Sequence, residues 1–322
     1  MTYRQLGRTD LNVSPIGLGT MQFSGKGLIS ALVPAISQTQ VDAIVKAALD
    51  GGITWFDTAE LHGGGKSERA LSAGLTRAGT APGEVVVASK WLPLGRTARS
   101  IERTFGNRIA ALDPFPVDLH QIHWGAGSLS PVRSQVRAMA RLVEAGKIRA
   151  VGVSNFTARQ MEIAYDELAK YGIPLATNQV QINLLHRKIE TDGTLETARR
   201  LGVTLIAYTP LRQGILTGKF HADRGLIQGI RPLRRKVMGL THEALDRSAP
   251  LIDAMRDVAD DHRATVGQVA LAWLISYYGD TVVAIPGASK PHHAEEAAGA
   301  LKVQLATDDL QRLADLSKYV QG

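Results

Sequence analysis

The stretch DGGITWFDTAELHGGGKSERALSAGLTRA, residues 50–78, decides the fold. Two glycines lead into the apolar run Ile53–Asp57, and after a polar loop the chain becomes an amphipathic segment, Ser67–Ala78. A short, continuous apolar run is typical of a parallel strand that is buried on both faces. A strand, a polar loop and a helix in this order predict one βα unit of an α/β fold.

The same alternation continues along the chain. Short apolar runs predict eight strands, and longer segments of helical period predict the helices between them. The expected strands are Pro15–Gly19, Ile53–Asp57, Val85–Ser89, Val117–His123, Ile148–Ser154, Asn178–Ile182, Val203–Tyr208 and Val282–Pro286. The expected helices are Thr39–Asp50, Ser67–Ala78, Thr97–Leu112, Pro131–Ala145, Thr157–Lys170 and Ile189–Leu201.

Eight strands separated by helices indicate a single (β/α)8 TIM barrel, which we expect to occupy residues 1–322. The alternative, two doubly wound halves, needs a G-x-G-x-x-G turn between a strand and a helix, and the glycines of His62–Gly65 lack that spacing. Residues 3–14 should form a hairpin over the bottom of the barrel. Two further helices, His242–His262 and Asp308–Lys318, should pack outside it.

The composition excludes several classes of protein. The chain has 322 residues, of which 44% are hydrophobic and 21% charged, as in a globular protein with a large core. Its net charge of +7 comes from scattered basic residues, and aromatic residues are only 5%, too few for a nucleic-acid stacking surface. No apolar run is long enough to span a membrane. The lack of cysteine rules out thiolate metal sites and suits a reducing cytoplasm, where we expect the protein to act.

Polar side chains gather where the predicted strands end. Asp57 ends the second strand, Lys90 follows the third and His123 ends the fourth. A buried Asp or Lys is costly unless it is paired. Because a barrel collects its chemistry at the carboxyl ends of its strands, these residues indicate an active site. Polar residues of the later strands should line the same mouth: Ser154, Asn155, Gln179 and Tyr208.

With these residues in place, the chain resembles the aldo-keto reductase family over nearly its whole length, in a branch similar to bacterial reductases and potassium-channel beta subunits. The resemblance rests on nine motifs. They are GLGTM (17–21), FDTAELHGGGKSE (56–68), ASKW (88–91), DLHQIHW (118–124), GKIRAVGVSNF (146–156), NQVQINLL (178–185), AYTPLRQGILTGK (207–219), VGQVALAWL (266–274) and IPGASKPHHAEE (285–296).

The resemblance implies reduction of a ketone or aldehyde by NADPH, with a Tyr–Lys–His–Asp tetrad that protonates the alkoxide. Asp57, Lys90 and His123 match three members of the tetrad, but His62 stands at the tyrosine position. A second departure, His120 where a tyrosine is usual, should face the helices and serve packing.

The resemblance also implies NADP(H)-binding positions around the barrel mouth. Thr20, Met21 and Asp57 should lie near the nicotinamide ribose, Ser154, Asn155 and Gln179 at the carboxamide, and Tyr208 on the nicotinamide ring. Leu211, Gln213, Gly214 and Lys219 should follow the pyrophosphate, and Gly287, Ser289, Lys290, His293 and Glu296 should surround the adenosine 2′-phosphate. His293 and Ala297 depart from the residues usual there.

A histidine at position 62 leaves the reaction open. A neutral imidazole N–H donates a hydrogen bond but is a poor acid, and the opposed charges of Lys90 and Asp57 leave the direction of its pKa shift unsettled. His62 could support hydride transfer to a carbonyl, an iminium or an activated enone. It could act as a base in a lyase or dehydratase reaction, or mark a silent NADP-binding subunit. A metal site made of two histidines and a carboxylate is disfavoured because Lys90 places a cation in the same pocket.

The partner expected from these features is a small-molecule substrate, with no nucleic acid and no membrane. The long first loop, Gln22–Gln38, should cover the substrate pocket, and its apolar residues suggest a bulky or partly apolar substrate.

Overall fold

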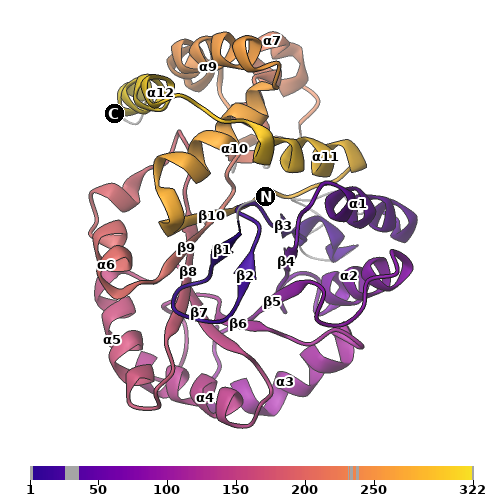
Figure 1. The fold of residues 1–322 in the computed structure, drawn as a ribbon, viewed down its shortest axis with the longest axis vertical. Coiled ribbons are helices and arrows are strands. Elements are labelled where there is room, and N and C mark those ends of the chain that lie inside the picture. Colours follow the sequence, from indigo (N-terminus) through magenta and orange to yellow (C-terminus); the bar gives the residue numbers. More distant parts are fainter. Residues whose placement is uncertain (1–2, 26–35, 231, 233–234, 237–238, 321–322) are drawn as a thin grey trace.

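The computed structural model describes residues 3–25, 36–230, 232, 235–236 and 239–320. Within them, eight parallel strands form a barrel surrounded by helices (Figure 1). The expected fold is therefore confirmed. The strands are β3 (Leu18–Gly19), β4 (Trp55–Asp57), β5 (Val86–Trp91), β6 (Leu119–Ile122), β7 (Ala150–Ser154), β8 (Leu175–Gln181), β9 (Thr204–Tyr208) and β10 (Val282–Ile285).

The strands lie side by side in chain order, from β3 to β10. Two isolated parallel bridges, Ile16↔Ala284 and Gly19↔Gly287, join the last strand to the first and close the barrel. All eight predicted strands are present, each shifted by a few residues at most. The shift matters at β5, which continues to Trp91, so that Lys90 lies inside this strand rather than after it.

Helices connect successive strands and cover the outside of the barrel. Each of the first six was predicted, but the one expected at Ile189–Leu201 begins later, because the left-handed Gly193 separates a short 3-10 turn from the helix. The six are α1 (Gln38–Asp50), α2 (Lys66–Arg77), α3 (Arg99–Leu112), α4 (Val132–Glu144), α5 (Ala158–Ala169) and α6 (Thr194–Leu201).

Among the described residues of the second half, the helices that were not predicted include α10 (Val266–Tyr277) and α11 (Pro291–Gly299). Most of α10 is buried, so its apolar residues surround the helix and leave no amphipathic period to recognise. The start of α10 could nevertheless have been predicted from the sequence, because the spacing of Thr265 and Gln268 is that of a capping box, which the structure contains.

The predicted N-terminal hairpin is present as β1 (Arg4–Gln5) and β2 (Asn12–Val13), paired antiparallel. Leu6, Leu11 and Val13 are fully buried in one apolar cluster with inward side chains of the barrel strands, among them Trp55. The hairpin therefore closes the bottom of the barrel, as expected.

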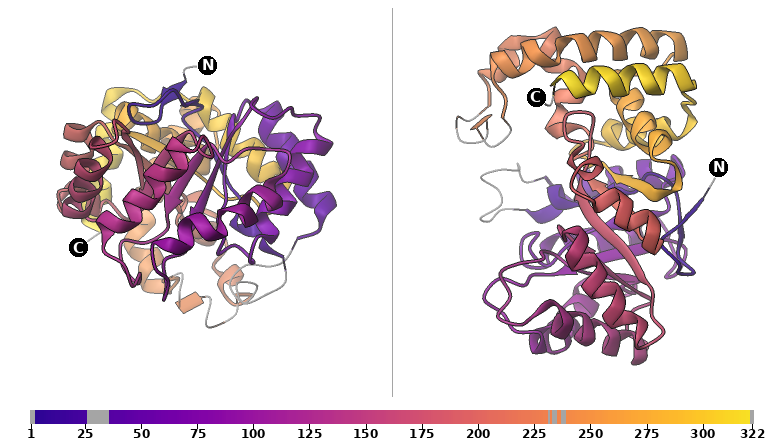
Figure 2. Two further views of the ribbon diagram at one scale, coloured as in Figure 1. Left: turned by 90° about the horizontal axis from the view of Figure 1, so that it is seen from below. Right: turned by 90° about the vertical axis from the view of Figure 1, so that its left-hand side faces the viewer.

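The two additional helices, α9 (His242–His262) and α12 (Thr307–Val320), pack against each other at one end of the molecule, outside α10 (Figures 1 and 2). Short elements fill the connection before α9. They are η4 (Arg212–Thr217), α7 (Lys219–Ala222) and η5 (Arg224–Ile227). No helix of the described residues is long and apolar enough to cross a membrane.

Candidate active site

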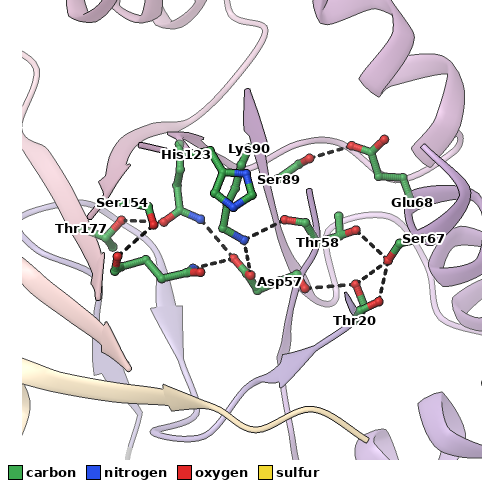
Figure 3. A network of polar contacts seen from close by, with 12 residues as sticks. Thr20, Asp57, Thr58, Ser67, Glu68, Ser89, Lys90, His123, Ser154 and Thr177 are labelled. Atoms are coloured by element: carbon green, nitrogen blue, oxygen red, sulfur yellow. Dashed lines mark hydrogen bonds and ion pairs between the residues drawn. The ribbon is translucent and has the colours of Figure 1, made fainter. Parts of the chain in front are cut away.

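A buried ion pair lies at the centre of the barrel mouth. Asp57 ends β4 and Lys90 lies on the neighbouring β5, and their side chains form a salt bridge while only 2–3% exposed (Figure 3). Lys90 Nζ also donates to the carbonyl oxygen of Thr58 at 2.9 Å. Both charges are thus compensated where water cannot reach them, as burial requires.

The second oxygen of the Asp57 carboxylate accepts two amide hydrogen bonds. Gln179 Nε2 donates to Oδ2 at 3.0 Å and Gln121 Nε2 donates to the same atom at 3.1 Å. Sequence reasoning identified Gln179 but missed Gln121, although its place two residues before His123 on β6 gives it the same inward direction. The two amides fix the orientation of the carboxylate that holds Lys90.

The rings of His62 and His123 lie close to Lys90 and edge-on to each other. Their ring centroids are 6.2 Å apart and the rings are nearly perpendicular, at 84°. The Nδ1 atom of each ring is buried and has no hydrogen-bond partner among the described residues. Four residues predicted as catalytic, Asp57, His62, Lys90 and His123, therefore meet in one place.

Both imidazoles are neutral near pH 7. Burial lowers the pKa of His62 well below its usual value, and the nearby Lys90 and His123 lower it further. Burial, followed by the charge of Lys90, lowers the pKa of His123 to about 3. The direction of the His62 shift, which the sequence left open, is thus downward, and a histidine with a lowered pKa is both a poor source of cationic acid and a weak base.

Ser154, Asn155 and Tyr208 form a polar group beside Asp57. Tyr208 donates to Asn155 Oδ1 at 3.0 Å, and Asn155 Nδ2 donates to Ser154 Oγ at 3.0 Å and to the carbonyl of His123 at 3.3 Å. Asn155 has a positive φ of 56°, an unusual backbone conformation for a non-glycine residue. Through these hydrogen bonds the Asn155 amide connects the end of β7 to the end of β9.

The residues expected near the first strand have different environments. Thr20 is fully buried and donates to the carbonyl of Asp57 at 3.0 Å, whereas Met21, at the start of η1 (Met21–Ser24), is 41% exposed. Most of the loop expected to cover the pocket, residues 26–35, lies outside the described residues.

The residues expected at the pyrophosphate lie on η4 and at the start of α7. Leu211 precedes η4, Gln213 and Gly214 have positive φ within it, and Lys219 begins α7. A Cβ added to Gly214 would lie 3.0 Å from Lys219 Nζ, so glycine allows this cation to approach the backbone. This arrangement suits a phosphate, because a lysine and an open loop backbone converge.

The residues expected at the 2′-phosphate gather at the start of α11. Burial lowers the pKa of His293, the nearby Lys219 and Lys290 lower it further, and Glu296 opposes them. His293 Nδ1 accepts from the Ser289 N–H at 3.3 Å, and Gly287 lies against the side chain of Gln22. Glu296, however, accepts from Thr265 at the start of α10, so it holds two helices together.

Two further expectations concern histidine and metal. His120 is buried and packs its ring on Phe105 of α3, with centroids 5.1 Å apart, which confirms that it faces the helices. Among the residues that the structure describes, no three or more His, Cys, Asp or Glu side chains form a group able to hold a metal ion.

Comparison with known proteins assigns the family. Residues 15–318 match the sequence model of the Aldo/keto reductase family. The chain is 33% identical to the chloroplastic pyridoxal reductase of Arabidopsis thaliana over 315 residues, which cover 94% of this chain and 83% of that protein. It is 36% identical over 313 residues to an uncharacterized oxidoreductase of Mycobacterium tuberculosis, covering 95% and 90%.

The fold is also similar to that of solved structures. An aldo-keto reductase from Klebsiella pneumoniae, crystallised in complex with NADPH, superposes with a TM-score of 0.74 at 29% identity, covering 98% of this chain and 95% of that one.

Proposed function

Because the chain belongs to the aldo/keto reductase family, we propose that it transfers hydride from NADPH to a carbonyl, imine or activated-enone carbon, with His62 at the position of the usual catalytic tyrosine. The chain is an NADP(H)-dependent oxidoreductase. The proposal concerns the role of His62 and the kind of substrate that this role allows.

The observation that supports it best is the buried pair of Asp57 and Lys90 beside His62 and His123. A protein that only stores a cofactor gains nothing from a desolvated lysine, and burying this ion pair is costly. Perturbed ionisable groups at a barrel mouth are typical of catalysis.

The chain offers suitable partners for each part of NADP(H). Amide and hydroxyl groups of Ser154, Asn155 and Gln179 suit a carboxamide, and the ring of Tyr208 offers a flat surface beside them. Lys219 and Lys290 suit phosphate groups, because charge-assisted hydrogen bonds to lysine are strong. The bound nicotinamide supplies the hydride.

A neutral His62 restricts the substrates. Its N–H can hydrogen-bond to a carbonyl oxygen, but it cannot readily protonate an alkoxide, as a tyrosine would. An imine that has already taken a proton from solvent, and so reacts as an iminium ion, needs no further proton after hydride addition. An enone becomes an enolate that solvent can protonate later. We therefore expect imines and activated enones to react faster than simple aldehydes. The lowered pKa of His62 also weakens it as the base of a redox-neutral reaction.

The test is a substrate panel in which NADPH absorbance and product are measured in the same tube. It should contain simple aldehydes, cyclic imines, activated enones and pyridoxal, the last because an Arabidopsis relative is a pyridoxal reductase. Product should form in a one-to-one ratio with oxidised NADPH. Conversion without NADPH loss would instead indicate redox-neutral chemistry, and no conversion of any compound would favour a binding subunit.

Two substitutions separate the role of His62 from that of the rest of the site. His62→Tyr should raise simple-aldehyde turnover by about 10²-fold or more, the usual contribution of a positioned general acid. His62→Phe should reduce turnover of every carbonyl substrate but leave NADPH affinity within about twofold, because the cofactor partners lie elsewhere. Wild-type aldehyde turnover in the ordinary enzyme range of ~1–10³ per second would contradict the proposed restriction.

A further inference from the structure

We propose that Ser67 is a positioning residue. Its hydroxyl holds the loop that contains His62 against the strand ends that contain Asp57 and Thr20. The inference deepens the proposed function and rests on it, because it assigns a task to a side chain that does not touch the reacting atoms.

Ser67 is the second residue of α2 and is fully buried. Its side chain points toward the strand ends of the barrel, where Thr20 and Thr58 lie (Figure 3). A buried hydroxyl needs partners, because burial without a hydrogen bond costs free energy.

The Ser67 hydroxyl lies within hydrogen-bonding distance of two other hydroxyl groups and one backbone carbonyl. Ser67 Oγ lies 2.7 Å from the carbonyl oxygen of Thr20, 2.9 Å from Thr20 Oγ1 and 3.0 Å from Thr58 Oγ1. Each hydroxyl has only one proton. In one consistent arrangement Ser67 donates to the Thr20 carbonyl, Thr58 donates to Ser67, and Thr20 donates to the Asp57 carbonyl at 3.0 Å.

The backbone of Ser67 is attached to the His62 loop. The Ser67 N–H donates to the His62 carbonyl at 3.2 Å, and the His62 N–H donates to the Ala59 carbonyl at 3.0 Å. Between His62 and α2 the chain consists of Gly63, Gly64 and Gly65, all with positive φ, and α2 then begins at Lys66. Glycines restrict the backbone least of all residues, so this loop depends on tertiary contacts for its position.

The other side of the network reaches the ion pair. Thr20 donates to the Asp57 carbonyl through both its N–H, at 2.9 Å, and its hydroxyl, and Lys90 donates to the Thr58 carbonyl at 2.9 Å. Ser67 therefore joins the histidine loop to Thr20, which bonds the backbone of Asp57, and to Thr58, whose carbonyl accepts from the Lys90 ammonium. Active-site geometry tolerates only small displacements, so loss of this connection should lower the rate.

Ser72 provides a matched control on the same helix. It is 5% exposed, and its hydroxyl donates one hydrogen bond, to the Asp113 carbonyl at 2.6 Å. Ser72→Ala thus removes a buried serine hydroxyl from α2 without touching the His62 loop. If Ser67 served only to stabilise α2, both alanine variants should behave alike.

The first measurement is hydrogen–deuterium exchange of the whole protein with NADPH, followed by mass spectrometry. Ser67→Ala should speed exchange in the peptide covering residues 59–67 by about tenfold, the effect of losing one net hydrogen bond. Ser72→Ala should leave that peptide unchanged. The inference would be overturned if this peptide exchanged at the same rate in both variants, or no faster in Ser67→Ala than in the wild type.

The second measurement is steady-state kinetics with NADPH and the compound of the substrate panel that the wild type reduces fastest. In Ser67→Ala we expect kcat to fall about tenfold, with the NADPH dissociation constant within about twofold of wild type, because the interaction acts on geometry rather than on binding. Ser72→Ala should retain kcat. An unchanged kcat in Ser67→Ala would also overturn the inference.

A second variant keeps the test decisive if Ser67→Ala does not fold. Thr58→Val removes the hydroxyl that donates to Ser67 and keeps the side-chain shape, so it should speed exchange of the same peptide. In the double variant the two effects should be less than additive, as for residues of one network. If the wild type reduces no substrate, the proposed function fails, yet the exchange result still decides whether Ser67 holds the loop.

Discussion

In the proposed site, the phosphate end depends on single cationic side chains. Lys290 precedes the first residue of α11, and both Lys290 and Lys219 lie close enough to the ring of His293 to affect its pKa. Burial is the largest cause that lowers the pKa of His293, and neighbouring positive charges lower it further. This ring is therefore neutral near pH 7. The attraction for an additional phosphate must therefore come from the lysines.

Replacing Lys290 by alanine should weaken NADPH binding about tenfold while changing NADH binding less than twofold. A charge-assisted hydrogen bond to phosphate contributes about 1.5–3 kcal/mol, and only NADPH carries the additional phosphate. Fluorescence titration with both cofactors measures the ratio. Lys302→Ala, which removes an exposed lysine of η7 (Ala300–Lys302), is the control. An equal loss for NADPH and NADH would contradict a 2′-phosphate role for Lys290.

The ionisable residues of the site and several uncharged ones could be predicted from the sequence, but Gln121 and Ser67 could not. Asp57 and Lys90 stand out because a charge in an apolar run is expensive to bury. Gln121 and Ser67 do not stand out, since an amide in a strand or a serine early in a helix has many ordinary explanations. Their meaning depends on distances to Asp57 and Thr20, which belong to segments far away in the chain.

At the level of elements, the alternation along β6 points neighbouring side chains to opposite sides of the barrel wall. Gln121 points inward to Asp57, whereas His120 points outward and packs on Phe105. Burial, followed by the charge of Arg108, lowers the pKa of His120 to about 3. In the unfolded chain its pKa is near 6.5. His120 therefore binds a proton more readily in the unfolded state, and protonation favours unfolding.

The pH dependence of stability should follow from this difference. The contribution is complete above about pH 6.5 and falls by about 1.4 kcal/mol per pH unit as the pH drops toward 3. His120→Leu should consequently remove about 2 kcal/mol of the destabilisation between pH 7 and pH 5, measured by urea unfolding. Phe105→Leu, which lacks a titrating group, should lower stability at both pH values and keep the slope. An unchanged slope in His120→Leu would show that the ring accepts its proton within the folded state.

The elements also show where sequence patterns lose information. Segments with one buried face, such as α1 and α4, gave helices within two residues of their observed bounds. Helices α10 and α11 were missed because apolar residues surround the first and the second is short. The start of α6 was placed too early because Gly193 adopts a left-handed conformation that interrupts an otherwise helical pattern.

For the whole molecule, ion pairs connect neighbouring helices around part of the barrel. Arg141 of α4 pairs with Glu102 of α3 at 2.6 Å, and Glu167 of α5 with Arg137 of α4 at 2.9 Å. An exposed pair such as Arg141–Glu102 contributes little, and in the other pair only the Glu167 carboxylate is buried, at 1% exposed. The main cohesion of the barrel comes instead from its apolar layers, including the cluster at the bottom that contains the hairpin residues Leu6, Leu11 and Val13.

The hairpin should therefore stabilise the barrel without taking part in cofactor binding. Leu11 is fully buried, so Leu11→Ala should cost about 3 kcal/mol in the free energy of unfolding through lost contacts and a cavity. The site lies at the opposite end of the strands, and the affinity for NADPH should stay within about twofold of wild type. Leu129→Ala, at a side chain that is 73% exposed, should cost less than about 0.5 kcal/mol and is the control. Urea unfolding compares the two variants, and a cost for Leu11→Ala as small as that of the control would mean that the barrel is stable without its hairpin.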